Sequence, residues 1–137
     1  MSQNDQQDNA RVIRETYEAF GRGDVAAIAS NVLPDARWDF NVVQSDVPWH
    51  VPVIGPAEVP AFLGAFVQNV TLETFEPHHF VCDGEDVIVH VRLAYTVNAT
   101  GKRVDQEQLH WWKVRSGKIA RLKHFEDTAQ VIAACRA

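Results

Sequence analysis

Two histidines near the C-terminal end of the chain, His110 and His124, are the residues best suited to acid–base chemistry. Both lie in runs of residues typical of β-strands, at positions of the same parity, which places them on one face of a sheet. Imidazole titrates near neutral pH, so one ring could abstract a proton beside a carbonyl group while the other ring, or Gln108, stabilises the developing oxyanion. Glu126 shares this face and could orient His124. We therefore predict that His110, His124 and Glu126 are catalytic.

The turn between the two strands sets which residues face each other. The segment Arg115-Ser116-Gly117 is typical of a three-residue loop that ends in a left-handed glycine, because a two-residue turn would place the serine at positive φ. In that register His110 lies opposite Leu122. His124 then lies opposite Gln108, so the two imidazoles are diagonal neighbours, roughly 7 to 8 Å apart at the backbone, with room for a small substrate group or a water.

The face that carries the histidines is mostly apolar, with a few polar groups, which is typical of a dry ligand pocket. Aromatic side chains from other elements would complete its wall, and they favour a flat or cyclic, mostly apolar ligand. Trp49 and His50 come from a loop and would act either as a cap on the cavity or as plain packing plugs. The residues expected to bind substrate are Trp38, Phe40, Trp49, His50, Leu93, Tyr95, Gln108, Trp112 and Leu122.

The pattern of apolar and turn residues predicts helices first and strands afterwards. The helices are expected over Asn9–Phe20, over Val25–Leu33 with Asp24 as its cap and Pro34 as its stop, and from Pro56 to about Asn69. Strands are expected over Ala36–Val43, 72–82, 87–97 and in the hairpin, with a loop at Gln44–Gly55 and a short helix, Ala129–Cys135, capped by Asp127 or Thr128. The predicted fold is α+β: three helices on a strongly curved, mainly antiparallel sheet that forms a cone around a pocket.

Length and charge restrict the class of protein. A chain of 137 residues fits one domain, expected over residues 9–137 after a flexible start at residues 1–8. Its net charge of -5 argues against nucleic acid and anionic membranes as partners, since both require a basic face. The polar start and the absence of a long apolar run predict a cytoplasmic protein.

The cysteines and histidines show no metal or redox spacing. Cys82 and Cys135 are far apart, and His78 and His79 would point to opposite faces of a strand. The set His110, His124 and Glu126 could in principle form a three-ligand site with an open position. Because nothing in that spacing is a metal signature, we expect no metal and no cofactor.

The opposite face of the sheet mixes charged residues with large apolar ones. Such an apolar area is larger than a monomer usually leaves in water. We therefore predict a two-fold homodimer through this outer face, with charged neighbours pairing across the axis. Its apolar residues are Ile88, Leu109, Trp111 and Phe125.

The chain resembles the SnoaL-like group of the nuclear transport factor 2-like superfamily over nearly its whole length. The resemblance rests on four short motifs: Tyr17-Glu18-Ala19-Phe20 with Gly23-Asp24, Gly55 before the third helix, Gly117-Lys118-Ile119, and His124-Phe125-Glu126-Asp127. It implies the cone fold and a small-molecule pocket, and it adds Tyr17 to that pocket. The relatives include ketosteroid isomerases, polyketide cyclases and limonene-type epoxide hydrolases, so the resemblance fixes the fold better than the reaction.

The active sites of these relatives transfer incompletely. By resemblance, the isomerase base falls on Phe40, its oxyanion tyrosine on Thr16 next to Tyr17, and its second oxyanion group on His110. The Arg-x-Asp pair of the epoxide hydrolases has no counterpart in the fourth strand. The cyclase arrangement of a histidine facing an aspartate matches His110, whereas the aspartate position holds His124, and Asp127 is better suited to capping a helix.

Three functions therefore remain open. The first is an acid–base enzyme of cyclase, isomerase or dehydratase type that acts on a small, largely apolar cyclic or carbonyl compound. The second is a non-catalytic binder of a small hydrophobic ligand. The third is a structural or interaction role, for which Trp38 and Trp112 would fill the cavity.

Overall fold

The structure is a computed structural model that describes residues 3–42 and 45–137. Val43 and Gln44, which the sequence assigned to the end of a strand and the start of a loop, lie outside the described residues. The elements in chain order are α1 (Gln3–Gly21), α2 (Val25–Ala29), β1 (Val32–Phe40), β2 (Val53–Ile54), the 3-10 helix η1 (Pro56–Glu58), α3 (Val59–Asn69), β3 (Val70–Asp83), β4 (Asp86–Val97), β5 (Arg103–Arg115), β6 (Lys118–Phe125) and α4 (Thr128–Cys135).

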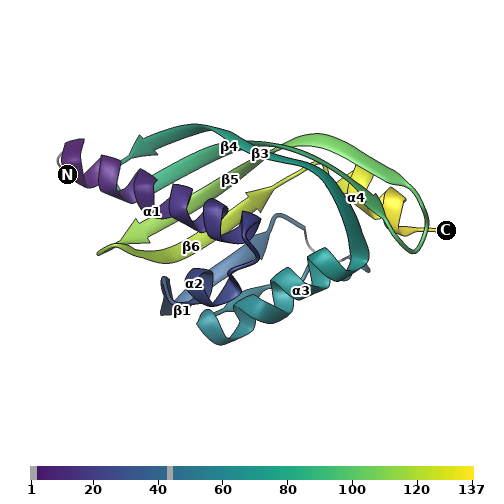
Figure 1. The fold of residues 1–137 in the computed structure, drawn as a ribbon, viewed down its shortest axis with the longest axis horizontal. Coiled ribbons are helices and arrows are strands. Elements are labelled where there is room, and N and C mark those ends of the chain that lie inside the picture. The colour runs from purple at the N-terminus through teal and green to yellow at the C-terminus, as the bar shows by residue number, and fades with distance from the viewer. Residues whose placement is uncertain (1–2, 43–44) are drawn as a thin grey trace.

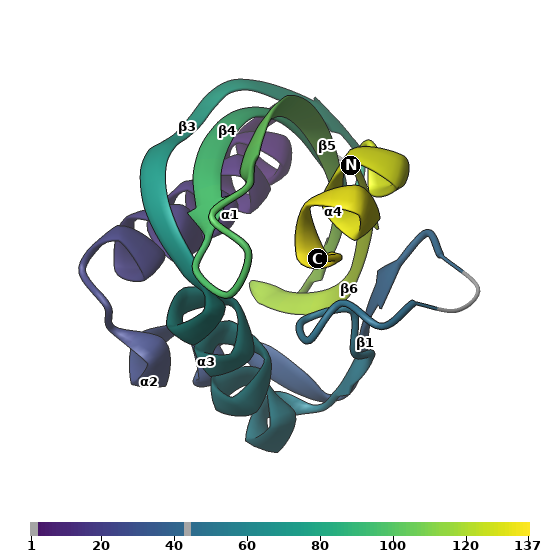
Figure 2. The same ribbon diagram turned by 90° about the vertical axis from the view of Figure 1, so that its right-hand side faces the viewer.

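The six strands form one curved sheet in the order β2-β1-β6-β5-β4-β3. All neighbouring pairs are antiparallel except β1 and β6, which run parallel. The sheet curls around the centre of the molecule, with α1, α2 and α3 across its open side and α4 at the end of β5 and β6 (Figures 1 and 2). The predicted α+β cone is therefore confirmed, with a sheet that is mixed at β1.

Helix α1 packs its apolar stripe against the inside of the sheet. Ile13 and Tyr17 are buried on this stripe, and Tyr17 contacts Phe75 and Phe80 of β3. The helix begins at Gln3 rather than at Asn9. The flexibility expected for residues 1–8 stays a prediction.

The second helix is shorter than the sequence predicts. It ends at Ala29, and Val32, Leu33 and Pro34 belong to β1 instead of to the helix. The parallel register with β6 shifts between Val32 and Arg37, so Pro34 lies in a stretch of irregular pairing, where a missing N–H costs little. The proline therefore does not mark the end of a helix, because irregular pairing accommodates it in a strand.

The β5–β6 hairpin differs from its predicted register. The turn has two residues, with Ser116 at φ 52° and Gly117 at φ 75°, and Arg115 pairs with Lys118. Positive φ at both turn positions matches the twist of the flanking strands. The three-residue loop expected from the sequence is therefore wrong.

One extra residue in β6 restores the expected faces of the later β6 residues. Without it, the two-residue turn would place each of them on the opposite face of the sheet. Val114 pairs with Ile119, whereas Lys113 pairs with Arg121, so Ala120 is the residue of a β-bulge. Beyond the bulge His110 pairs directly with His124, rather than with Leu122. Between the turn and the bulge, the two-residue turn pairs Ile119 with Val114, and Ile119 is fully buried in the core.

The caps of the two short helices follow the sequence prediction. Asp24 accepts a hydrogen bond from the backbone N–H of Ala27 at 3.1 Å. Asp127 accepts one from the N–H of Gln130 at 3.2 Å and begins α4. The Asp127 carboxylate is thus occupied with capping. Among the described residues, no helix is long and apolar enough to cross a membrane.

Candidate active site

A cavity of about 90 Å³ lies between the concave face of the sheet and helices α1 and α3. Most of the predicted pocket residues line it: Tyr17, Trp38, Phe40, Trp49, Leu93, Tyr95, Gln108, His110, Trp112, Leu122, His124 and Glu126. Ligand pockets typically have roughly 300 to 1,000 Å³. This cavity therefore fits a small ligand, and a larger one would require wall residues to move.

Seven wall residues were not among those predicted to bind substrate: Thr16, Phe20, Ile28, Phe62, Leu63, Phe66 and Phe75. Of these, Thr16 is the position that the resemblance assigned to the oxyanion tyrosine of the isomerases. The apolar face of α3 signals Phe62, Leu63 and Phe66, since that face has to pack against the sheet. His50 was expected to bind substrate but does not line the cavity; its ring lies behind Phe40, at 4.8 Å between ring centroids.

The isomerase-like position on β1 is filled as the resemblance indicated. Phe40 lines the cavity, whereas Asp39 points away and pairs with Arg37 at 3.1 Å. No carboxylate of β1 therefore enters the cavity.

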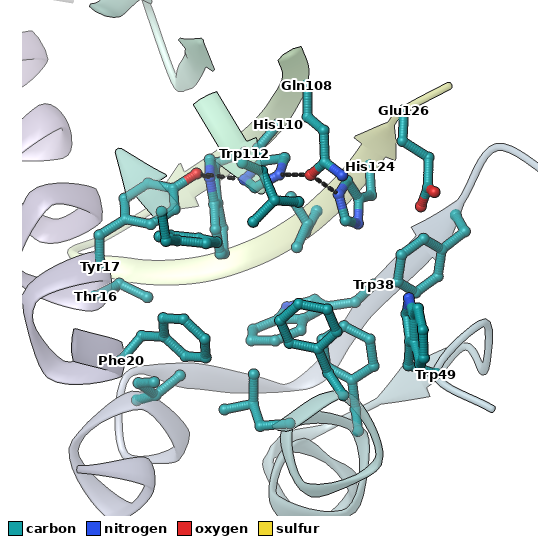
Figure 3. Close-up of a pocket in the computed structure, with 18 of the residues that line it drawn as sticks. Thr16, Tyr17, Phe20, Trp38, Trp49, Gln108, His110, Trp112, His124 and Glu126 are labelled. Atoms are coloured by element: carbon teal, nitrogen blue, oxygen red, sulfur yellow. Dashed lines mark hydrogen bonds between the residues drawn. The ribbon is translucent and has the colours of Figure 1, made fainter. Parts of the chain in front are cut away.

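Four polar side chains form a row along one wall of the cavity (Figure 3). The Tyr17 hydroxyl lies 2.6 Å from Nδ1 of His110, and Nε2 of His110 lies 3.0 Å from Oε1 of Gln108. Nε2 of His124 lies 2.7 Å from the same oxygen. The imidazole rings cross nearly at right angles, with centroids 4.3 Å apart, so the predicted gap for a water between them is absent.

The backbone of Asp127 fixes the orientation of the first amide in this network. Its N–H donates to Oε1 of Gln106 at 3.1 Å, and its carbonyl accepts from Nε2 of Gln106 at 3.3 Å. A backbone N–H can only donate and a carbonyl can only accept, so the oxygen and nitrogen of Gln106 are assigned without ambiguity.

The orientation of the Gln106 amide determines the orientation of the next amide, that of Gln108. Its oxygen accepts a second hydrogen bond from Nε2 of Gln108 at 3.2 Å, so Oε1 of Gln108 must face the histidines. That oxygen can only accept, and both His110 and His124 therefore carry their proton on Nε2. Nδ1 of His110 is then an acceptor for the Tyr17 hydroxyl, which in turn accepts from the Trp112 indole N–H at 2.9 Å.

Burial keeps both imidazoles neutral. It lowers the pKa of His110 to about 3. It also lowers the pKa of His124 well below its usual value, and the neighbouring His110 and His50 add to this effect. Burial raises the pKa of the Tyr17 hydroxyl, so that this group remains a donor. The sequence predicted imidazoles that titrate near neutral pH, and the lowered pKa values of both rings correct that expectation.

His110 and His124 consequently differ in what they can do. Both ring nitrogens of His110 are occupied by hydrogen bonds, so this ring has no nitrogen left for a ligand. Nδ1 of His124 carries a lone pair and has no hydrogen-bond partner among residues 3–42 and 45–137. In Figure 3 this nitrogen faces the space above Trp38. It is the one imidazole nitrogen of this row that can take a proton from a ligand.

Glu126 does not orient His124, contrary to the sequence prediction. Its Oε1 lies 3.2 Å from Nε2 of His50, and both side chains are almost fully buried. The other nitrogen of His50 lies 2.9 Å from Oγ of Ser45, which also accepts from the backbone N–H of Val47 at 3.0 Å. Ser45 was not singled out in the sequence, because nothing in its spacing from His50 signals a contact.

A metal site does not assemble from these groups. Within the described part of the chain, no three side chains of histidine, cysteine, aspartate or glutamate come together in a way that could hold an ion. The possible set of His110, His124 and Glu126 is divided, because Glu126 pairs with His50.

Comparison with known proteins identifies the family. The family model of the SnoaL-like domain matches residues 13–122, and the chain belongs to this family. No curated protein matches the sequence.

Solved structures of NTF2-like proteins share the fold. An NTF2-like protein from Burkholderia xenovorans LB400 has a TM-score of 0.86 and 24% identity, over 96% of this chain and 98% of that chain. An NTF2-like protein of unknown function from Burkholderia pseudomallei K96243 has a TM-score of 0.84 and 26% identity over 100% of both chains. An LEH-like epoxide hydrolase from M. tuberculosis has a TM-score of 0.73 and 15% identity, over 95% of this chain and 90% of that chain.

The neutral histidines predict a specific loss of stability in acid. Between pH 6.5 and about 3 the unfolded chain protonates His110 while the folded chain does not, so stability present above pH 6.5 is lost as the pH falls. The free energy of unfolding should fall by about 1.4 kcal/mol per pH unit for each such histidine. His110→Gln should reduce this slope in denaturant unfolding measured from pH 7 to pH 4.

The exposed His79 on β3 provides the control for that experiment. His79→Gln should leave the slope of the wild type unchanged, because water solvates this ring in both states. A His110→Gln variant with the same pH dependence as the wild type would contradict the assignment of a neutral, buried His110.

Proposed function

We propose that the protein is an acid–base enzyme of cyclase, isomerase or dehydratase type that acts on a small, largely apolar cyclic or carbonyl compound. The observation that carries the proposal is the lone pair on Nδ1 of His124, which has no hydrogen-bond partner in the described part of the chain, on a residue that lines an apolar cavity. In this proposal His124 is the general base, and a carbon acid next to a carbonyl group is its substrate.

The surrounding residues favour proton transfer to this nitrogen. Gln108 holds Nε2–H of His124 at 2.7 Å, which fixes the ring and stabilises the positive charge that develops when Nδ1 takes a proton. His110 holds Gln108 from the other side, and the Tyr17 hydroxyl holds His110. The apolar wall excludes water and so strengthens each of these interactions.

A non-catalytic binder of a small hydrophobic ligand is the second candidate. The low pKa of His124 favours it, since a weakly basic imidazole removes a proton from carbon less readily. In the binder, the row from Tyr17 to His124 would only hold the shape of the wall.

Hydrogen exchange at carbon separates the enzyme from the binder. A general base at His124 should catalyse exchange of the α-hydrogens of small cyclic ketones such as cyclohexanone in D₂O, followed by proton NMR. His124→Gln should reduce this rate by roughly two to four powers of ten, the usual contribution of one positioned base. The rate should also stay constant as the pH falls through 6.5, because the lowered pKa of His124 keeps Nδ1 unprotonated there.

His90 provides the matched control for the exchange experiment. It lies on β4 outside the cavity and pairs with Glu107 at 3.1 Å, so His90→Gln should keep the wild-type rate. Exchange by the wild type at the buffer rate with every ketone tested would favour the binder, and equal rates for His124→Gln and the wild type would remove His124 as the base.

We further propose that two copies associate through the outer face of the sheet, formed by Ile88, Leu109, Trp111 and Phe125. Ile88, Leu109 and Trp111 are 36%, 48% and 40% exposed, which is a large apolar area for one surface. Arg92, Glu107 and Lys113 carry both signs of charge on the same face, and such a face can pair with its own copy about a two-fold axis.

Light scattering tests this dimer. The wild type should be a dimer at micromolar concentration, and Trp111→Asp should shift it to a monomer by placing a charge at the centre of the apolar contact. Val51→Asp, at a 52% exposed apolar residue of the loop, is the control and should remain a dimer. A monomeric wild type, or a dimer that tolerates Trp111→Asp, would contradict the proposal.

A further inference from the structure

Two residues that line the cavity each carry a polar atom without a hydrogen-bond partner among the described residues. Within the described residues, the fully buried side-chain nitrogen and oxygen atoms without a hydrogen bond are Nε1 of Trp38 and Oε2 of Glu126. Both residues line the cavity, and their side chains are 4% and 3% exposed. A buried N–H or carboxylate oxygen without a partner is unfavourable, so a folded protein rarely leaves two of them in one cavity without a function.

The Trp38 ring is held in place by its neighbours rather than by its N–H. It packs edge-on against Phe62 and Trp112, with ring centroids 6.0 Å and 5.6 Å apart. The adjacent Trp112 differs because its own N–H donates to the Tyr17 hydroxyl at 2.9 Å. The indole of Trp38 can only donate, so this part of the wall lacks an acceptor.

Oε2 of Glu126 lacks a hydrogen-bond donor among the described residues, whereas Nε1 of Trp38 lacks an acceptor. One carboxylate oxygen is occupied by His50 at 3.2 Å, while Oε2 remains without a donor. An ionised carboxylate can only accept, so this part of the wall lacks a donor.

The strands place His124 between these two groups. Trp38 pairs with Leu122 and Phe40 pairs with His124 in the parallel β1–β6 register, and Glu126 follows β6. Along the chain direction of β6, Leu122 marks the level of Trp38, His124 comes next, and Glu126 follows the end of the strand. A ligand that contacted both Trp38 and Glu126 would therefore span the level of His124 on β6.

We infer that the ligand supplies both missing partners: an acceptor oxygen, such as a carbonyl, for the Trp38 N–H, and a hydroxyl that donates to Oε2 of Glu126. The ligand class is thus a small ring compound that carries a carbonyl and a hydroxyl group. This inference rests on the proposed function, because it assumes that the cavity binds a small ring. It assigns Trp38 and Glu126 to orienting the ring beside His124.

Pairs of probes with matched shape test the two contacts separately. Benzaldehyde and styrene differ in whether they offer a carbonyl acceptor, and phenol and toluene differ in whether they offer a hydroxyl donor. Dissociation constants from NMR titration give a styrene-to-benzaldehyde ratio and a toluene-to-phenol ratio for each variant. Comparing ratios between variants removes the general effect of ring size and hydrophobicity.

For Trp38, the styrene-to-benzaldehyde ratio should fall about tenfold in Trp38→Phe, as expected for one lost hydrogen bond. Trp111→Phe is the matched control, since this indole lies on the outer face of the sheet, where its N–H donates to Asp86 at 2.9 Å, and its ratio should stay at the wild-type value. In the wild type, the indole N–H resonance of Trp38 should also shift with benzaldehyde and not with styrene, a measurement that needs no variant.

For Glu126, the toluene-to-phenol ratio should fall roughly ten- to hundredfold in Glu126→Met, since hydrogen bonds to charged groups are stronger. Glu107→Met, on the outer face, is the matched control and should keep the wild-type ratio. If Glu126→Met does not fold, the wild type alone decides: phenol should bind more tightly than anisole, which has the same oxygen without the donor.

The outcomes distinguish this inference from the proposed function. Ratios that do not change in Trp38→Phe and Glu126→Met, or a wild type that binds anisole as tightly as phenol, would overturn the inference and leave the exchange chemistry of His124 untouched. Failure of all four probes to bind the wild type would overturn both the inference and the small-ring pocket on which it rests.

Discussion

The pair of hydrogen bonds between Gln106 and the backbone of Asp127 is the constraint on which the chemistry of the cavity depends. These bonds fix which end of the Gln106 amide is oxygen, and Gln108 then presents its own oxygen to both imidazoles. The histidines must donate from Nε2, and Nδ1 of His124 is left as a lone pair. The backbone of a helix-capping residue thus determines which nitrogen of the His124 imidazole carries the proton.

The same constraint explains why the site requires the whole fold. Asp127 lies where β6 passes into α4, Gln106 and Gln108 lie on β5, and Tyr17 comes from α1. Each of these side chains satisfies its neighbour, and Nδ1 of His124 at the end of the row is the ring nitrogen that this network leaves without a partner among the described residues. The two buried atoms without a partner among the described residues, on Trp38 and Glu126, belong to cavity-lining residues outside this row.

Much of the fold follows from local patterns in the sequence. The cone was predicted from the alternation of apolar residues on β4 and β5, from the aspartate caps and from the glycine turns. The same patterns predicted most of the pocket lining. Each pattern depends only on residues close together in the chain. The direct pairing of His110 with His124 was not predictable from the sequence, because it depends on the bulge at Ala120. No residue type in this segment indicates a bulge. The contact between His50 and Glu126 was not predicted for a related reason. It joins a loop residue to a residue at the end of a strand, 76 positions away in the sequence.

The ionisation of the histidines also lay beyond the sequence. A pattern of residues shows that imidazoles share a face, but the pKa depends on how completely tertiary packing removes water from each ring. Burial replaces the expected pair of titrating imidazoles with two neutral rings: His110, whose nitrogens both have hydrogen-bond partners, and His124, whose Nδ1 has none among the described residues. This difference arises from packing rather than from residue type.

Nitrogen NMR of the histidine side chains tests the central claim most directly. With ¹⁵N-labelled histidine, His110 and His124 should each show a protonated Nε2 and an unprotonated Nδ1 at pH 7, and this pattern should persist at pH 5.5. Nδ1 of His124 should change its shift when a hydroxyl-bearing ring such as phenol enters the cavity. An Nδ1–H tautomer of His124, or an imidazolium at pH 5.5, would contradict the account.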